Sequence, residues 1–306
     1  MMEKKYYPTD VEVASFEEFL VHEKDGGYYI FNPKNKINTK IDFGAGCDKS
    51  RDFDIASNEL LDFSVFAGSG DIYFVDNKSG NIIKQNKIQG ESFENTLLCS
   101  NGNIMYSKVN GEDYIYNLTN NNSFVKLQKE ISHNPLLSND GRYFAAYLEN
   151  DALGVFNCQD GGLCWENGNA YTSNGGNMIC FNEDASIIAC VSDGNIVYAF
   201  DVKTGNVIHK FEFLEDVTCI DLSDSLLLCG LKNGEIKILD VSKKRIVQTI
   251  QNICTGPVWW SMTKNNVIEC FSGEIIASIP YIPTKNLALR MNEKFNGNRN
   301  GRKCVK

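Results

Sequence analysis

The residues of this chain that could carry chemistry are carboxylates, which recur at a regular interval along the sequence. They lie in or beside short turns that contain glycine or asparagine, each between two apolar runs. Carboxylates gathered on one face would create a negative potential there and attract basic groups of a partner. Aspartate also favours tight hairpins, so turn formation alone is the alternative explanation. In chain order these residues are Asp25, Asp71, Glu112 with Asp113, Glu149 with Asp151, Asp193, Glu235 and Glu274.

Motifs that would indicate an enzyme are incomplete. Segment 44–50 has the composition of a phosphate-binding loop, but Asp48 stands where that loop needs glycine, and an acid there would repel phosphate. The three histidines, at positions 22, 133 and 209, do not have the spacing of metal ligands. We therefore predict no catalytic residue, no metal, no cofactor and no small-molecule substrate. A pair of central carboxylates acting in a hydrolase is the enzymatic alternative.

A phrase that recurs about every forty residues predicts the elements that position these turns. Each copy ends a strand-like run with an apolar residue, which is followed in six copies by Asp or Asn. The steps between copies are 44, 41, 40, 44, 39 and 40 residues. A unit of this length with four short strands is typical of a β-propeller blade, so seven copies predict seven blades. The copies are Phe31-Asn32, Val75-Asp76, Tyr116-Asn117, Phe156-Asn157, Phe200-Asp201, Leu239-Asp240 and Ile279-Pro280.

The sixth unit shows the expected four strands most clearly. Its second run, 226–231, is almost entirely apolar, which indicates a strand buried on both faces. The hairpin that follows contains Asn233-Gly234, a favoured pair for a tight turn. We therefore predict an all-β fold, a seven-bladed propeller of four-stranded antiparallel blades over residues 1–291.

Two motifs resemble those of the WD40 family. Residues 192–201 look like that family's hairpin and the strand that ends in Trp-Asp, with Phe200 in place of tryptophan, and residues 138–142 look like its turn between the first two strands. No unit has the literal Trp-Asp pair or the usual Gly-His pair, which puts the family's His–Asp network in doubt. A PQQ-type propeller is the rival resemblance, but its recurrent tryptophan in the last strand is missing. The WD40 resemblance implies a docking platform for other proteins.

Charge and cysteine content bear on the partner and the compartment. The net charge of −9 disfavours nucleic-acid binding through the body of the protein. The eleven cysteines include pairs at equivalent repeat positions, such as Cys190 and Cys229, which suggests small buried core residues of an intracellular protein. No apolar run approaches the ~18–20 residues of a membrane helix, and the first residues lack the apolar core of a signal peptide. We expect a cytoplasmic protein without a membrane partner, with the nucleus as the alternative.

The last residues, 292–306, differ from the rest of the chain because they are basic and rich in Asn and Gly. This composition predicts a flexible tail that could contact RNA or a protein partner. The pair Trp259-Trp260 is a candidate contact point if either ring lies at the rim, and core packing is the alternative. The basic residues at this end are Arg290, Lys294, Arg299, Arg302, Lys303 and Lys306.

The sequence thus predicts a non-enzymatic scaffold or adaptor for protein–protein interaction within a larger complex. Its acidic loop face would receive a partner segment rich in Lys and Arg. One alternative is a WD40 platform associated with the ribosome or another ribonucleoprotein, with the tail on RNA. The other is the hydrolase named above. A propeller fold by itself does not separate these functions.

Overall fold

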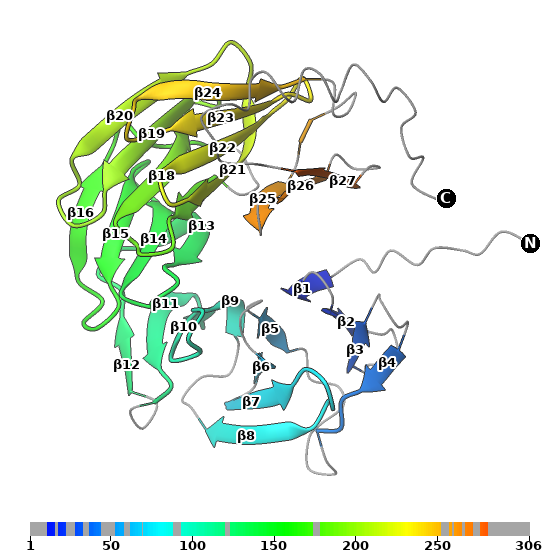
Figure 1. Ribbon diagram of the computed structural model, residues 1–306. Coiled ribbons are helices and arrows are strands. Elements are labelled where there is room, and N and C mark those ends of the chain that lie inside the picture. Colours follow the sequence, from blue (N-terminus) through cyan, green and yellow to red (C-terminus); the bar gives the residue numbers. More distant parts are fainter. Residues whose placement is uncertain are drawn as a thin grey trace, which may run out of the picture. The chain divides into compact units, whose positions relative to one another are not determined.

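The protein is described here by a computed structural model. It describes residues 11–15, 18–22, 28–32, 37–43, 53–57, 62–68, 70–87, 93–119, 123–173, 178–251, 257–258, 260–264, 267–271 and 276–280. Every regular element in these ranges is a strand (Figure 1). No helix of the described residues is long and apolar enough to cross a membrane. The predicted tail, 292–306, and the predicted last strand of the seventh unit lie outside the described residues.

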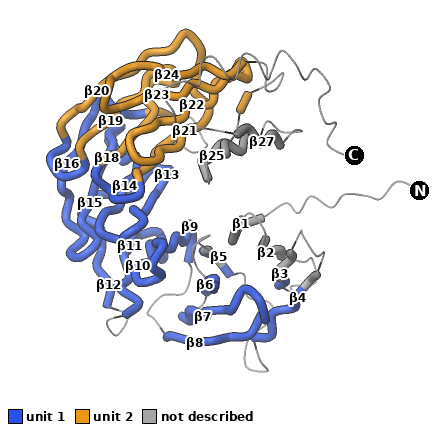
Figure 2. The backbone as a smooth tube through the Cα atoms, in the orientation of Figure 1, with its two compact units in different colours: residues 1–171, 183–186, 202–205 blue, residues 172–182, 187–201, 206–306 orange. Residues whose placement is uncertain are grey.

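The chain divides into two compact units (Figure 2). Unit 1 comprises residues 1–171, 183–186 and 202–205, and unit 2 comprises residues 172–182, 187–201 and 206–306. Both are built from antiparallel meanders in which each strand pairs with the next one along the chain.

Unit 1 contains four sheets of four strands each. The first two consist of β1 Val11–Ser15, β2 Glu18–His22, β3 Tyr28–Asn32 and β4 Ile37–Lys40, then β5 Asp54–Ser57, β6 Phe63–Gly68, β7 Asp71–Asp76 and β8 Ile82–Lys87. The next two consist of β9 Phe93–Leu98, β10 Ile104–Val109, β11 Glu112–Asn117 and β12 Ser123–Lys126, then β13 Ile131–Leu137, β14 Tyr143–Leu148, β15 Leu153–Asn157 and β16 Leu163–Asn167.

Unit 2 contains two sheets of four strands and, among its described residues, one of three. The four-stranded sheets consist of β17 Ile179–Phe181, β18 Ile187–Ser192, β19 Ile196–Asp201 and β20 Val207–Glu212, then β21 Val217–Ser223, β22 Leu226–Leu231, β23 Ile236–Asp240 and β24 Arg245–Ile250. The last sheet consists of β25 Trp260–Lys264, β26 Val267–Phe271 and β27 Ile276–Pro280.

The recurrent phrase marks the end of the third strand in every sheet, as the repeat predicts. All seven copies coincide with the last two residues of β3, β7, β11, β15, β19, β23 and β27. First strands are less well delimited by the sequence. The expected strand at 135–138 starts earlier, at Ile131, because a bulge keeps 131–134 paired with β14. The hairpin predicted at Asp193-Gly194 has positive φ at both residues, whereas in the one predicted at Asn233-Gly234 only Gly234 has a positive φ.

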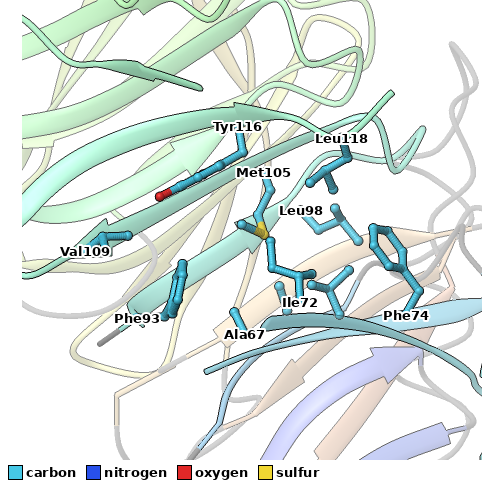
Figure 3. Packing of buried hydrophobic residues seen from close by; sticks show 11 residues of the cluster. Ala67, Ile72, Phe74, Phe93, Leu98, Met105, Val109, Tyr116 and Leu118 are labelled. Atoms are coloured by element: carbon cyan, nitrogen blue, oxygen red, sulfur yellow. The ribbon is translucent and has the colours of Figure 1, made fainter. Parts of the chain in front are cut away.

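Two sheets of unit 1, β5–β8 and β9–β12, pack against neighbouring sheets on both faces. In β6, Val65 belongs to the cluster shared with the β9–β12 sheet, whereas Phe66 belongs to the cluster shared with the β1–β4 sheet. In β10, Met105 packs toward the β5–β8 sheet (Figure 3). Its neighbour Tyr106 packs toward the β13–β16 sheet. Successive strand residues point to opposite faces, so a strand covered on both sides must be apolar throughout. This explains the nearly continuous apolar second strands.

First strands of successive sheets lie beside one another within each unit. In unit 1, β1 contacts β5, β5 contacts β9, and β9 contacts β13. In unit 2, β17 contacts β21, and β21 contacts β25. Consecutive sheets are therefore stacked face to face with their first strands together.

Buried cysteines occupy equivalent places in this packing, as predicted from their spacing. Cys190 in β18 and Cys229 in β22 are fully buried free thiols, and Cys180 and Cys219 in the adjoining first strands are also buried. Burial raises the pKa of the Cys190 thiol far above its ordinary value. These residues therefore act as small apolar side chains of the core.

The polar residue of the recurrent phrase organises the turn between the third and fourth strands. The side chain of Asp76 accepts hydrogen bonds from the backbone N–H groups of Lys78 and Ser79, at 3.1 and 2.7 Å. Asn157 accepts one from the N–H of Gln159 at 2.8 Å, and Asp240 accepts one from that of Lys243 at 2.9 Å. Asp and Asn are suited to this local bonding, which explains their recurrence at this position.

Asp240 gives the stability of unit 2 a defined pH dependence. Burial opposes ionisation, but bonds from Lys243 and Ser242 outweigh it and hold the pKa of Asp240 at about 2. An aspartate in the unfolded chain has a pKa of about 3.9. The charged form therefore stabilises the fold fully above about pH 4 and loses that contribution as the pH falls toward 2. In urea unfolding, Asp240→Asn should be less stable than wild type at pH 7, with the difference narrowing from pH 4 to pH 2. A difference that stays constant over this range would contradict this assignment.

Candidate protein-interaction surface

The hairpins between second and third strands carry the predicted carboxylates. The structure describes five such hairpins, and each has at least one acidic residue at the tip or at the start of the third strand. Asp25, Glu274 and Trp259 lie outside the described residues, as do all the basic residues from Arg290 onward. Trp260 begins β25, and only its backbone is described.

In unit 1, the tip between β14 and β15 is the most open acidic hairpin. Glu149 and Asp151 are both exposed, and Asp151 has a φ of 59°, a conformation that aspartate tolerates in turns. The backbone of this turn is fixed by a hydrogen bond from the N–H of Asp151 to the carbonyl of Leu148 at 3.1 Å. Asp71 begins β7 and accepts a hydrogen bond from Gln85 at 3.1 Å. These carboxylates are thus held on short, well-bonded turns.

Lysines on neighbouring strands neutralise part of the negative charge. Lys126 of β12 forms an ion pair with Glu112 at 2.5 Å, and this bond, together with one from Tyr114, lowers the pKa of Glu112. At the same end of these sheets, Lys129 pairs with Glu166 at 2.9 Å. Strand pairing places Lys126 beside Glu112, because Lys126 pairs with Tyr114. The spacing of the acids alone therefore did not reveal these pairs.

Asp113 does not belong to the exposed carboxylates. It is only 5% exposed, and it accepts hydrogen bonds from the Tyr106 hydroxyl at 2.8 Å and from the N–H of Ile131 at 3.2 Å. It therefore links β11 to the first strand of the next sheet and is unavailable to a partner. Strand alternation carried the signal for this correction, since neighbours such as Glu112 and Asp113 must face opposite sides.

In unit 2, Asp193 is exposed in the three-residue turn between Ser192 and Ile196. Glu235 is more enclosed: it pairs with Lys237 at 2.9 Å, both side chains are about one-fifth exposed, and this bond lowers the pKa of Glu235. Lys232, in the hairpin between β22 and β23, pairs at 2.9 Å with Asp216, which lies in the loop between the two four-stranded sheets. The exposed negative charge on the hairpin side of unit 2 therefore comes mainly from Asp193 and from the exposed loop residues 214–216.

Comparison with known proteins gives no match from sequence: no family model matches the chain, and no curated protein matches it. Solved structures do match. A β-propeller domain of Cps50 (Swd1) from Myceliophteria thermophila aligns over 90% of this chain and 99% of its own length, with a TM-score of 0.57 and 10% identity. The fold is of the β-propeller type. A computationally designed protein, Ika8, aligns over 90% of this propeller and 83% of its own chain, with a TM-score of 0.66 and 14% identity.

The likeness concerns the fold of the propeller alone, since both identities are low. The turn predicted at 138–142 does join β13 to β14. Within it, Asp140 accepts hydrogen bonds from the Ser138 hydroxyl and the Arg142 N–H, both at 2.9 Å. Arg142 also donates to the carbonyl of Asp184 at 2.9 Å, which ties this turn to the next one of the same kind.

The difference between the buried Asp113 and the exposed Glu112 predicts different effects of their substitution on the free energy of unfolding. Asp113→Ala leaves the Tyr106 hydroxyl and the Ile131 N–H without their acceptor, so it should lower the free energy of unfolding by about 3 kcal/mol. Glu112→Ala, the matched control one residue away, removes an exposed ion pair with Lys126 and an exposed hydrogen bond from Tyr114, so its cost should be much smaller than that of Asp113→Ala. Urea unfolding compares the two. Adding Tyr106→Phe to Asp113→Ala should recover part of the loss, and equal costs for the two single variants would refute the distinction.

Proposed function

We propose that this propeller is a non-enzymatic scaffold of the WD40-like type, with seven blades and an acidic hairpin face that receives a Lys/Arg-rich segment of a partner protein. Support for seven blades comes from the seven copies of the recurrent phrase, each ending the third strand of one sheet. The three-stranded sheet would then be the seventh blade. Support for a WD40-like blade comes from the 138–142 turn and the Asp193-Gly194 hairpin.

The observation that carries the proposal is the recurrence of a carboxylate in all five described hairpins between second and third strands. Turn chemistry accounts for Asp or Asn beside Gly, but it does not require glutamate, and Glu112, Glu149 and Glu235 are glutamates. In a chain of net charge −9, such hairpins add to a negative field. A field of this kind raises the association rate and selects basic partners more than it determines affinity.

The scaffold itself supports an interaction role. Its hairpins project from strands that are buried on both faces, so the loops are presented by a stiff framework. Lysine pairing reduces the charge of Glu112 and Glu235 but leaves Glu149, Asp151 and Asp193 exposed at their tips. We place the partner inside the cell, in keeping with the seven free thiols among the described cysteines.

Charge reversal tests this proposal through kinetics. The variant Glu112→Lys with Glu149→Lys should slow association with a short synthetic peptide rich in Lys and Arg by about three- to tenfold at low salt, and by less at high salt. Stopped-flow or surface-binding measurements at several salt concentrations give the rates. Both positions are exposed, so the fold should persist, and circular dichroism checks that it does.

The matched control reverses the same number of charges at the other end of the strands. Asp62→Lys with Glu183→Lys changes turns between first and second strands and alters the net charge equally. Its association rate should stay closer to that of wild type. Equal slowing in both double variants would mean that only net charge matters and would contradict a specific acidic face. Binding of a single-stranded RNA probe in preference to the peptide would favour the ribonucleoprotein alternative instead.

A further inference from the structure

A groove of about 560 Å³ lies in unit 1 between the β9–β12 and β13–β16 sheets. Its volume falls within the range of ligand sites, roughly 300–1,000 Å³. One wall is formed by Ile104, Ile115 and Val125, and the other by Arg142, Tyr143 and the Asn157–Gln159 turn. The groove lies at the end of these strands opposite to the acidic hairpins, so it is independent of the face proposed above.

The fourth strand of each sheet has one equivalent position that faces the next turn. In each of the six four-stranded sheets, this residue pairs with the third-strand residue two positions before the recurrent Asp or Asn. Thus Trp165 pairs with Val155, and Val125 pairs with Ile115. Five of the six described residues at this position carry a hydrogen-bond donor, and Val125 alone does not. The six are Thr39, Lys84, Val125, Trp165, His209 and Gln248.

Two of these donors show what the position does. The Trp165 indole N–H donates to the carbonyl of Val202 at 2.7 Å, and the ammonium of Lys84 donates to that of Leu118 at 3.3 Å. Both acceptors immediately follow the recurrent polar residue of the next sheet. The equivalent carbonyl opposite Val125 belongs to Cys158, and a valine side chain has no donor to offer it.

The turn glycines confirm that the two positions are equivalent. Gly161 and Gly205 have the same φ of 69°, and each closely approaches the fourth strand of the preceding sheet. A Cβ on Gly205 would lie 2.7 Å from Cγ of Trp165, and one on Gly161 would lie 3.4 Å from Cγ2 of Val125. The frame is therefore conserved between the two sites, but the side chain is an indole in one and a smaller valine in the other.

We propose that the groove beside Val125 is a binding site for a tryptophan side chain of a partner protein. The indole would pack against the apolar wall and donate its N–H to the Cys158 carbonyl, as Trp165 does to Val202. Arg142 is the one charged residue of the lining, and its side chain is 61% exposed although its Nε pairs with Asp140 and its Nη2 donates to the carbonyl of Asp184. A guanidinium has five N–H donors, so its further N–H groups could bond a carboxylate next to the tryptophan. The partner segment is therefore a tryptophan with an acidic neighbour.

The first test titrates the full chain with a short peptide in which glutamates flank one tryptophan, and with N-acetyltryptophanamide. Calorimetry should show one site for each, with the peptide several-fold tighter because of Arg142. A peptide whose indole nitrogen is methylated should bind about tenfold more weakly, because the bond to the carbonyl is lost. No saturable binding of either probe, or binding of the free amide without the peptide, would overturn the proposal.

Two variants exchange the residues of the two grooves. Val125→Trp should fill its own groove, abolish peptide binding and keep or raise the thermal midpoint. Trp165→Val should open a second groove and raise the number of tryptophan sites from one to two. If Trp165→Val fails to fold, Val125→Trp still decides the matter, since wild-type affinity in that folded variant would refute the site. Arg142→Met should remove the advantage of the acidic peptide over the amide, and an unchanged advantage would refute the predicted acidic neighbour.

Discussion

Burial of strands on both faces of their sheet is the constraint on which the rest of this structure depends. The side chains of Val65 and Phe66, neighbours on one strand, belong to different clusters on opposite sides of their sheet. A sheet covered in this way gains stability from two interfaces, but it must be apolar in both directions. Exposed polar residues then lie mainly at strand ends, in turns and on outer strands, whereas buried ones such as Thr96 and Ser107 bond to each other between strands. Potential contact residues are accordingly found at those places.

Local patterns made the third strand and its turns predictable from sequence. The recurrent Asp or Asn follows an apolar run because its side chain bonds the next turn, as at Asp76 and Asp240, and such bonding involves only neighbours in the chain. First strands were harder to predict, since the bulge in β13 depends on its pairing with β14. The pairing of Asp113 with Tyr106 and Ile131 likewise depends on contacts that sequence spacing does not encode.

The acidic hairpins and the groove show two different relations between repetition and function. Hairpin acids recur in each described hairpin between second and third strands, so they could be recognised by counting along the sequence. The groove arises where one copy departs from the others, at Val125, and this departure became visible only when the strand registers aligned it with Trp165. In a repeated framework, the absence of a donor side chain at one position is informative, because equivalent residues such as Trp165 and Lys84 bond a carbonyl of the next turn.

The buried thiols of the second strands also allow local opening of the sheets to be measured in the unmodified protein. Cys190 and Cys229 lie in different sheets of unit 2, and an alkylating reagent can reach either only when the surrounding strands separate. Their modification rates under native conditions therefore measure the opening free energies of two adjacent sheets separately. Equal rates are expected if the two sheets open together. Unequal rates would show which sheet opens more readily, without any engineered label.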